Sequence, residues 1–308
     1  MTKSITSRDP QGRHATSIFE AAYNQCRLDK GAAQQLNERG GELRAGIAKL
    51  LAELSISDQY ANEEVGSNYA YPKEYKGPKR IEYQIRALAK ILDLDPSQAL
   101  EFAKNLPALP DGAEGWFAIP SVDALAKKHF PEVTDPAQKY CQAVQLVHAK
   151  VAASRPFHNY YEGQITPAQL QVHARTAHAL TYLAETQKGD LPTGQTDILI
   201  VAAQLGMRHR GKSVRRARKV FMANEFGLGS LAVGSIVLTH PERLVRSCEE
   251  LNMNCSGDEF SPEDDGDFSA SLGFGCYTDK VRFASNFVEI AGVFSGQVSG
   301  FLPGSQTL

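Results

Sequence analysis

Apolar residues recur at helical spacing through the first half of the chain. Two stretches show the pattern most clearly, and their apolar positions are Leu43, Ile47, Leu50, Leu51 and Leu54, then Ile81, Ile85, Leu88 and Leu92. Because one helical turn takes 3.6 residues, this spacing places the side chains on one face of a helix. The pattern predicts a mainly helical region from about residue 15 to 188, in which each helix buries one apolar stripe.

Three further helix starts are marked by a capping side chain followed by proline. These pairs are Asp95-Pro96, Asp135-Pro136 and Thr166-Pro167. The capping oxygen accepts hydrogen bonds from the free amides of the first turn, and proline is well tolerated at the first helical position. We therefore expect helices to begin at residues 96, 136 and 167, with His173 on the apolar face of the last one.

Beyond Gly189 the pattern changes to β-branched and glycine-spaced segments. The expected elements are strands over 198–203 and 230–239, a helix over 213–226 closed by glycine, a short helix over about 241–251, and strands over 271–277, 280–289 and 293–302. Thr278 and Asp279 indicate a hairpin turn. We predict an α+β fold, with a mainly helical region over 1–190 and a mixed α/β domain over 191–308 that ends in antiparallel strands.

Composition excludes several classes of protein. The chain has 308 residues, of which 42% are apolar and 22% charged, as in ordinary globular proteins, and its net charge of -2 creates no general attraction to nucleic acid or membranes. The longest strongly apolar run, 198–203, is too short to cross a bilayer, and the N-terminus lacks an apolar signal segment. We expect a cytoplasmic protein that has no membrane partner and whose five scattered cysteines are reduced.

A basic segment at residues 206–221 carries the most distinctive chemistry. Its seven cations are Arg208, Arg210, Lys212, Arg215, Arg216, Arg218 and Lys219, with no acid among them. Four of these share one face of the predicted helix: Lys212, Arg215, Arg216 and Lys219. Such a helix can pack its apolar side against the fold and present a row of cations to the phosphates of a polyanion.

An acidic run gives the basic segment another interpretation. Eight acids and no base occupy residues 249–267: Glu249, Glu250, Asp258, Glu259, Glu263, Asp264, Asp265 and Asp267. Ion pairs within one chain, or between the basic helix of one copy and the acidic run of another, would neutralise the cations without nucleic acid. A self-assembling or partner-binding structural protein is therefore an alternative function.

The segment from Gly206 to Ser213 also matches the phosphate-loop pattern G-x-x-x-x-G-K-[ST], after a predicted strand and before a predicted helix. In such a loop the amides and Lys212 would hold phosphates and the hydroxyl of Ser213 would bind Mg²⁺. The four intervening residues are bulky, and no apolar strand ending in an acid follows. A nucleotide- or phosphate-substrate enzyme is a second alternative, although a plain anion site using Arg208 or Arg210 is favoured over hydrolysis.

Other candidate chemistry is weaker. His240, Cys255, Asp258 and Glu259 could form a nucleophilic site, yet His240 before Pro241 is equally explained as a helix cap. His173 and His178 are five residues apart, which does not place them on one helix face as a metal site would require. The acidic loop at 261–269 departs from the calcium-binding EF-hand pattern. We expect no cofactor and no metal, and we assign no catalytic residue.

Short segments along the chain carry one resemblance. AEGWFAIP at 113–120, RHRGKSVRRAR at 208–218, and NEFGLG, LTHPERL and GDEF between residues 224 and 260 resemble a family of uncharacterised bacterial proteins. The similarity covers most of the chain from about residue 67. It implies a bacterial, intracellular origin, and it implies no activity, cofactor or catalytic residue.

The leading function predicted from the sequence is non-enzymatic binding of a polyanion, with nucleic acid as the expected ligand. Lys212, Ser213, Arg215, Arg216 and Lys219 would face the phosphates, and Arg208 and Arg210 would lie at the entrance to the helix. Contacts of this kind position a backbone without discriminating between bases. Any specificity would come from elsewhere, such as the aromatic loops at 67–80 and 106–120.

Overall fold

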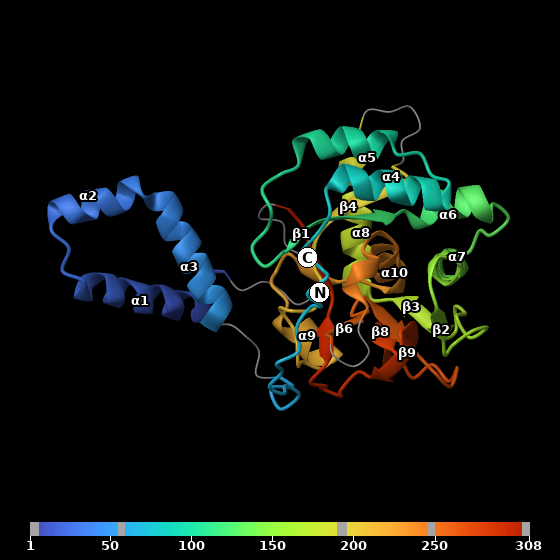
Figure 1. The fold of residues 1–308 in the computed structure, drawn as a ribbon. Coiled ribbons are helices and arrows are strands. Elements are labelled where there is room, and N and C mark those ends of the chain that lie inside the picture. The colour runs from blue at the N-terminus through green and yellow to red at the C-terminus, as the bar shows by residue number, and fades with distance from the viewer. Residues whose placement is uncertain (1–5, 55–58, 190–195, 246–249, 304–308) are drawn as a thin grey trace. The chain divides into compact units, whose positions relative to one another are not determined.

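The computed structural model describes residues 6–54, 59–189, 196–245 and 250–303 (Figure 1). The chain is α+β, as the sequence predicted, and it divides into two compact units, residues 1–56 and 57–308. The boundary expected near residue 190 falls inside the larger unit. Segments on either side of it pair there, because β1 (Gly115–Pro120) and β4 (Ile198–Gln204) are antiparallel neighbours.

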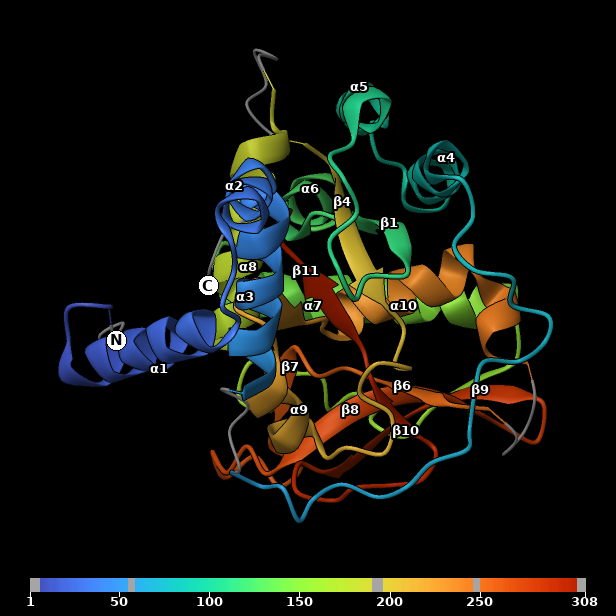
Figure 2. The ribbon, with the colours of Figure 1, turned by 90° about the vertical axis from the view of Figure 1, so that its left-hand side faces the viewer.

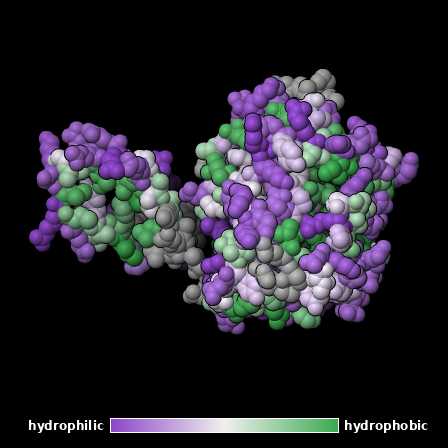
Figure 3. Space-filling model, in the orientation of Figure 1, coloured by the Kyte–Doolittle hydropathy of each residue, from purple (hydrophilic) through white to green (hydrophobic). Residues whose placement is uncertain are grey.

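In the part of the smaller unit that the structure describes, three helices lie without a buried core. They are α1 (Pro10–Gln25), α2 (Lys30–Glu38) and α3 (Gly40–Leu54). None of the side chains described in residues 6–51 is buried. In the view of Figure 3, hydrophobic side chains gather on the visible face of this unit. The helix predicted over 43–54 is confirmed, but the burial of its stripe is wrong for Leu50 and Leu51; the side chain of Leu54 lies outside the described residues.

The larger unit contains the remaining elements. Its helices are α4 (Ile81–Leu92), α5 (Ser97–Phe102), α6 (Val122–His129), α7 (Pro136–Ser154), α8 (Ala174–Gln187), α9 (Val214–Val220) and α10 (Ser230–Thr239), with single 3₁₀ turns η1 (Ala103–Asn105) and η2 (Pro241–Arg243). Its strands after β1 are β2 (Phe157–Asn159), β3 (Leu170–Val172), β4 (Ile198–Gln204), β5 (Glu225–Gly227), β6 (Asn252–Asn254), β7 (Asp258–Phe260), β8 (Ala270–Tyr277), β9 (Lys280–Phe287), β10 (Ser295–Gln297) and β11 (Ser299–Phe301).

These strands form two sheets with helices between and around them. The first sheet is antiparallel in the order β1-β4-β11-β5, and the second runs β10-β6-β8-β7-β3, with β9 beside β8 and β2 beside β9. Helix α10 packs against β1 of the first sheet, β8 of the second and the long helix α7 (Figure 2). Only Val298 separates β10 from β11, so the chain passes directly from one sheet to the other at this point.

Several predicted elements are confirmed. The stripe of α4 is buried, β4 covers the predicted strand at 198–203, and α7 begins at Pro136 with Asp135 accepting a hydrogen bond from the amide of Gln138 at 2.7 Å. The predicted hairpin joins β8 to β9. Its two turn residues, Thr278 and Asp279, have φ values of 47° and 61°, which is the left-handed geometry of a type I′ turn.

The prediction of a strand at 230–239 is wrong, because this segment is helix α10. All but one of its ten residues are buried, so apolar side chains surround the helix and no polar face reveals the helical period. Two of its hydroxyl groups donate along the helix, Ser235 Oγ to the carbonyl of Leu231 at 2.7 Å and Thr239 Oγ1 to the carbonyl of Ile236 at 3.1 Å. Gly234 lets Val147 and Phe274 approach closely, and a Cβ there would lie 2.9 Å from Val147 Cγ1.

Three other predicted helices begin or end elsewhere. The helix expected over 213–226 ends at Val220, because Glu225–Gly227 joins the first sheet as β5. The helix expected from Thr166-Pro167 begins at Ala174, because Leu170–Val172 pairs with β7. From Pro241 only the turn η2 forms; residues 246–249 of that prediction lie outside the described residues. The strand expected at 293–302 is two strands, one in each sheet.

Candidate functional site

Most of the basic segment is paired within the larger unit. Two acids that precede α4, Glu63 and Glu64, pair with three of its seven cations. Lys212 Nζ lies 2.7 Å from Glu64, Arg216 pairs with the same carboxylate, and Arg215 binds Glu63 through two nitrogens. The hydrogen bond from Arg215 lowers the pKa of Glu63, which therefore stays charged. The expected row of cations is thus largely neutralised by internal ion pairs.

The arginines at the two ends of the segment are also engaged. Arg208 Nε lies 3.4 Å from the buried carboxylate of Glu225, and Arg210 donates to the carbonyl of Tyr69 at 3.2 Å. Arg218 donates to the carbonyls of Ser256 and Asp258, and lies 3.7 Å from Glu259. Within the described part of the chain, Glu259 is the acid of the 249–267 run that pairs with this segment, and Glu249 lies outside that part.

The loop that matches the phosphate-loop pattern is bonded to the rest of the protein. Five of its amides donate to acceptors outside the loop: those of Gly206 and Arg208 to Gln204, Met207 to Tyr71, Gly211 to Ser295 and Ser213 to Glu63. The hydroxyl of Ser213 donates to Glu63 at 2.6 Å. Because these amides, the hydroxyl and Lys212 already have partners, the loop offers no cradle for a phosphate chain.

A pocket of about 270 Å³ lies where α9 meets the start of α8. We call it the cationic pocket, and its lining residues are Tyr60, His173, Arg175, Arg215, Arg218, Lys219, Phe221, Gly227 and Ser256. Three of the four cations come from or near α9, whereas Arg175 comes from the first turn of α8. The tertiary fold therefore gathers positive charge from two distant segments around one hollow, and its described lining residues include no acid.

Two cations of this pocket have no acidic partner among the described residues, whereas Arg215 and Arg218 are each paired. Arg175 donates to the backbone carbonyls of Met222 and Ala223, and its Nε is buried without a hydrogen-bond partner in the described structure. Lys219 is exposed. Burial lowers the pKa of Arg175, as expected for a cation that water no longer fully solvates. An anion in the pocket would relieve this partial desolvation.

The remaining walls of the pocket supply hydrogen-bonding and aromatic groups. His173 caps α8, and its Nδ1 accepts from the amide of Arg175 at 3.3 Å. Burial and the charge of Arg218 lower the pKa of His173, so the neutral ring has its other nitrogen protonated and able to donate. The guanidinium of Arg215 lies 4.4 Å from the ring centre of Tyr60. The pocket thus combines donors, cations and aromatic surface.

The structure separates the residues of the weaker catalytic hypothesis. His240 follows the C-terminal end of α10, while Asp258 accepts from the amide of Ser230 at the other end, so a ten-residue helix lies between them. Cys255 is fully buried, and burial raises the pKa of its thiol, which disfavours the reactive thiolate. Among the described residues, no group of three or more His, Cys, Asp or Glu could hold a metal ion.

No family model, curated protein or solved structure matches this chain. The resemblance to uncharacterised bacterial proteins stays a prediction. In the described part of the chain no helix is long and apolar enough to span a membrane. Interpretation of the cationic pocket therefore depends on its geometry.

Sequence reasoning missed the residues that complete this pocket. Arg175 was unremarkable in the sequence, and His173 was expected on an apolar helix face rather than at a helix cap. The pattern VHAR at 172–175 contained a local signal, since a polar residue after a short apolar run can cap a helix. Nothing in the sequence showed that this cap would lie beside residues more than forty positions away.

Proposed function

We propose that the protein binds a phosphate-bearing polyanion, with nucleic acid as the ligand class, and that a phosphate group occupies the cationic pocket. The observation that carries this proposal is the pair of cations, Arg175 and Lys219, that line one hollow without acidic partners in the described structure. Attraction between such cations and phosphates supplies most of the affinity of proteins that bind nucleic acid without sequence preference.

The aromatic wall favours single-stranded over double-stranded nucleic acid as the ligand. Tyr60 and Phe221 line the same hollow as the cations, and proteins that bind single strands commonly combine a positively charged groove with rings on which bases stack. A duplex keeps its bases paired and stacked, so it could present only its phosphates to the pocket. We expect tighter binding of single strands at equal length.

Lys219 is the most informative residue to change. It is exposed and makes no hydrogen bond or ion pair in the described structure, so its substitution leaves the fold intact. Lys212, Arg215 and Arg216 are poor probes, because changing them would break the ion pairs with Glu63 and Glu64. Lys280 on β9 is also exposed and serves as the matched control, since Lys280→Glu changes the net charge by the same amount.

Fluorescence anisotropy with labelled single- and double-stranded oligonucleotides tests the proposal across about 50 to 200 mM salt. We expect the logarithm of the affinity to fall linearly with the logarithm of salt concentration. Lys219→Glu should weaken binding about tenfold or more, or by about 1.4 kcal/mol, while Lys280→Glu changes it much less. The proposal is wrong if wild-type protein does not bind at the lowest salt, or if both variants weaken binding equally.

Light scattering on the same samples separates this function from self-assembly. The ion pairs of the basic segment described above lie within one chain, so no second copy is needed to neutralise those cations. We expect the mass of the free protein to be independent of salt concentration. A mass that falls as salt rises, together with no oligonucleotide binding, would favour assembly through charged surfaces.

A further inference from the structure

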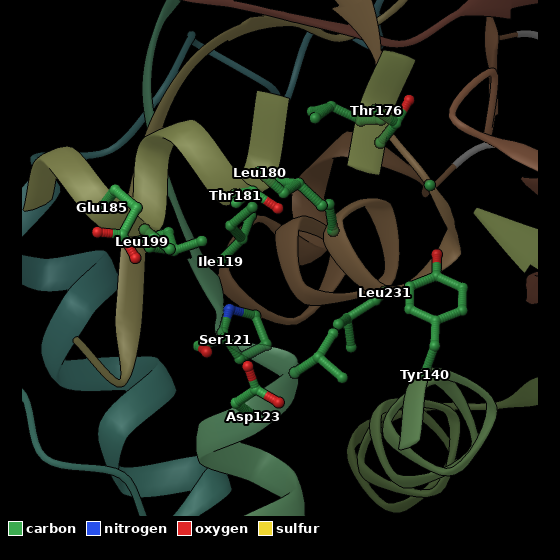
Figure 4. Close-up of a pocket in the computed structure, with 16 residues that line it drawn as sticks. Ile119, Ser121, Asp123, Tyr140, Thr176, Leu180, Thr181, Glu185, Leu199 and Leu231 are labelled. Atoms are coloured by element: carbon green, nitrogen blue, oxygen red, sulfur yellow. The ribbon is translucent and has the colours of Figure 1, made fainter. Parts of the chain in front are cut away.

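A second cavity of about 280 Å³ lies in the larger unit among the starts of α6 and α10 and one face of α8 (Figure 4). We call it the apolar cavity, and its lining residues are Ile119, Pro120, Ser121, Val122, Asp123, Tyr140, Thr176, Leu180, Thr181, Ala184, Glu185, Leu199, Leu228, Gly229, Leu231 and Ala232. It shares no lining residue with the cationic pocket. Its chemistry can therefore be considered separately.

Hydrocarbon side chains on rigid elements form part of the cavity wall. Ile119 lies on β1, Leu199 on β4 and Leu231 on α10, and all three are buried in the core of the unit. An apolar cavity of about 150 Å³ in a protein core can hold a benzene molecule. The apolar cavity is larger, so a ring with a short side chain fits its size. Binding of such a ligand would release water from the apolar surfaces of the ligand and of the cavity.

Three of the four hydroxyl groups that line the cavity donate to the protein, whereas Ser121 Oγ accepts from the amide of Ala124 at 3.4 Å. Tyr140 donates to Asp258 at 2.6 Å, Thr176 to the carbonyl of Gly227 at 2.9 Å, and Thr181 to the carbonyl of Ala177 at 3.0 Å. These oxygens can therefore only accept further hydrogen bonds. A donor group on a ligand can therefore bind to any of these three oxygens.

The charged side chains that line the cavity are both acids. Asp123 on α6 and Glu185 on α8 are exposed, and no basic side chain is among the lining residues. Lys139 lies 3.5 Å from Asp123, and Lys188 pairs with Glu185. Exposed pairs of this kind are worth little, so an arriving cation can replace either lysine at small cost. The charge and the hydrogen-bonding capacity of the cavity both favour a cationic donor.

We infer that the apolar cavity is a binding site for a small organic amine. The hydrocarbon body of the ligand occupies the space between Ile119, Leu199 and Leu231, and its ammonium group lies at the acidic rim formed by Asp123 and Glu185. This site is independent of the proposed polyanion site, because the two hollows share no residue and select opposite charges.

Isothermal titration calorimetry with three probes of similar shape tests this inference: 2-phenylethylamine, 2-phenylethanol and 3-phenylpropionate. We expect the amine to bind about tenfold more tightly than the alcohol, and the carboxylate to bind most weakly. Equal or tighter binding of the carboxylate overturns the assignment of charge. Absence of binding by all three probes overturns the site itself.

Variants of the full chain locate the binding. The double variant Asp123→Asn with Glu185→Gln should reduce the affinity for the amine to that for the alcohol, while Glu162→Gln, an exposed acid that does not line the cavity, leaves it unchanged. Ala184→Leu places three more carbon atoms in the cavity and should abolish binding of both amine and alcohol. The inference is contradicted if the Ala184→Leu variant still binds the amine, or if the double variant binds it with unchanged affinity.

Discussion

Helices α3 and α4 have similar apolar periodicity and opposite surroundings. In α4, Ile85, Leu88 and Leu92 are completely buried against the core of the larger unit. In α3, Leu50 and Leu51 are 53% and 56% exposed. The spacing of apolar residues correctly predicted both helices, because it depends only on local geometry. It did not predict what covers the stripe, because that depends on which other segments fold beside it.

The comparison extends to charged residues. In the smaller unit, Arg39 and Glu42 form an ion pair that is largely exposed to solvent. In the larger unit, Glu225 is fully buried and accepts from His209, Ser299 and the amide of Met222. Exposed pairs contribute little to stability, whereas a buried carboxylate destabilises the fold strongly if one of its partners is removed. The two units should therefore respond very differently to equivalent substitutions.

The largest expected difference is between Leu88→Ala and Leu51→Ala. Removing the buried side chain of Leu88 should lower the free energy of unfolding by about 3 kcal/mol, because transfer energy is lost and a cavity remains. Leu51→Ala should change it by less than about 0.5 kcal/mol. Urea unfolding measures both, with Trp116 fluorescence reporting the larger unit and circular dichroism reporting all helices. Equal effects would show that α3 is packed against a partner in solution.

A smaller difference should separate Glu225→Gln from Glu42→Gln, and it should depend on pH. Burial alone would raise the pKa of Glu225, but the hydrogen bond from His209 and the other donors hold it below its ordinary value of 4.5. A lowered folded-state pKa means that charged Glu225 stabilises the fold at pH values above 4.5, and that this contribution disappears as the pH falls through the folded-state pKa.

Glu225→Gln should therefore lower the free energy of unfolding by about 1–3 kcal/mol at neutral pH. This difference from wild type should become smaller in acid. Thermal unfolding at a series of pH values from 7 downward measures it. Glu42→Gln should cause no detectable change at any pH, because Glu42 and its partner are exposed. If the difference in the free energy of unfolding between wild type and Glu225→Gln increases in acid instead, the carboxyl of Glu225 is protonated in the native state at neutral pH.

The sequence was most informative where a local rule determines structure. Asp135-Pro136 correctly marked the start of α7, and Thr278-Asp279 marked the hairpin, since capping and turn geometry depend on a few adjacent residues. It failed at α10, where burial on every side removed the amphipathic signal. The end of α9 was also missed, because it is set by pairing of β5 with β11, more than seventy residues further along the chain.

The candidate site was predicted only in part for a similar reason. The density of cations at 208–219 was visible in the sequence, and Lys219 and Arg215 do line the cationic pocket. The acids that pair with Lys212, Arg215 and Arg216 lie about 150 positions earlier, at Glu63 and Glu64, and were not foreseen. The sequence shows which charged residues a segment contains, whereas the availability of those charges to a ligand depends on tertiary contacts.

The smallest expected effect concerns removal of the smaller unit. The hydrophobic core and the apolar residues packed against it contain no residue before Tyr71 among those described. The lining of both pockets also comes from residue 60 onward. A chain of residues 57–308 should therefore have a free energy of unfolding within about 0.5 kcal/mol of that of the full chain, and it should keep its affinity for oligonucleotides and for 2-phenylethylamine.

Urea unfolding, anisotropy and calorimetry measure these quantities. A loss of several kcal/mol would mean that the exposed stripe of α3 is covered in the native protein and contributes to its stability, whereas a loss of oligonucleotide affinity alone would place part of the binding surface in residues 1–56.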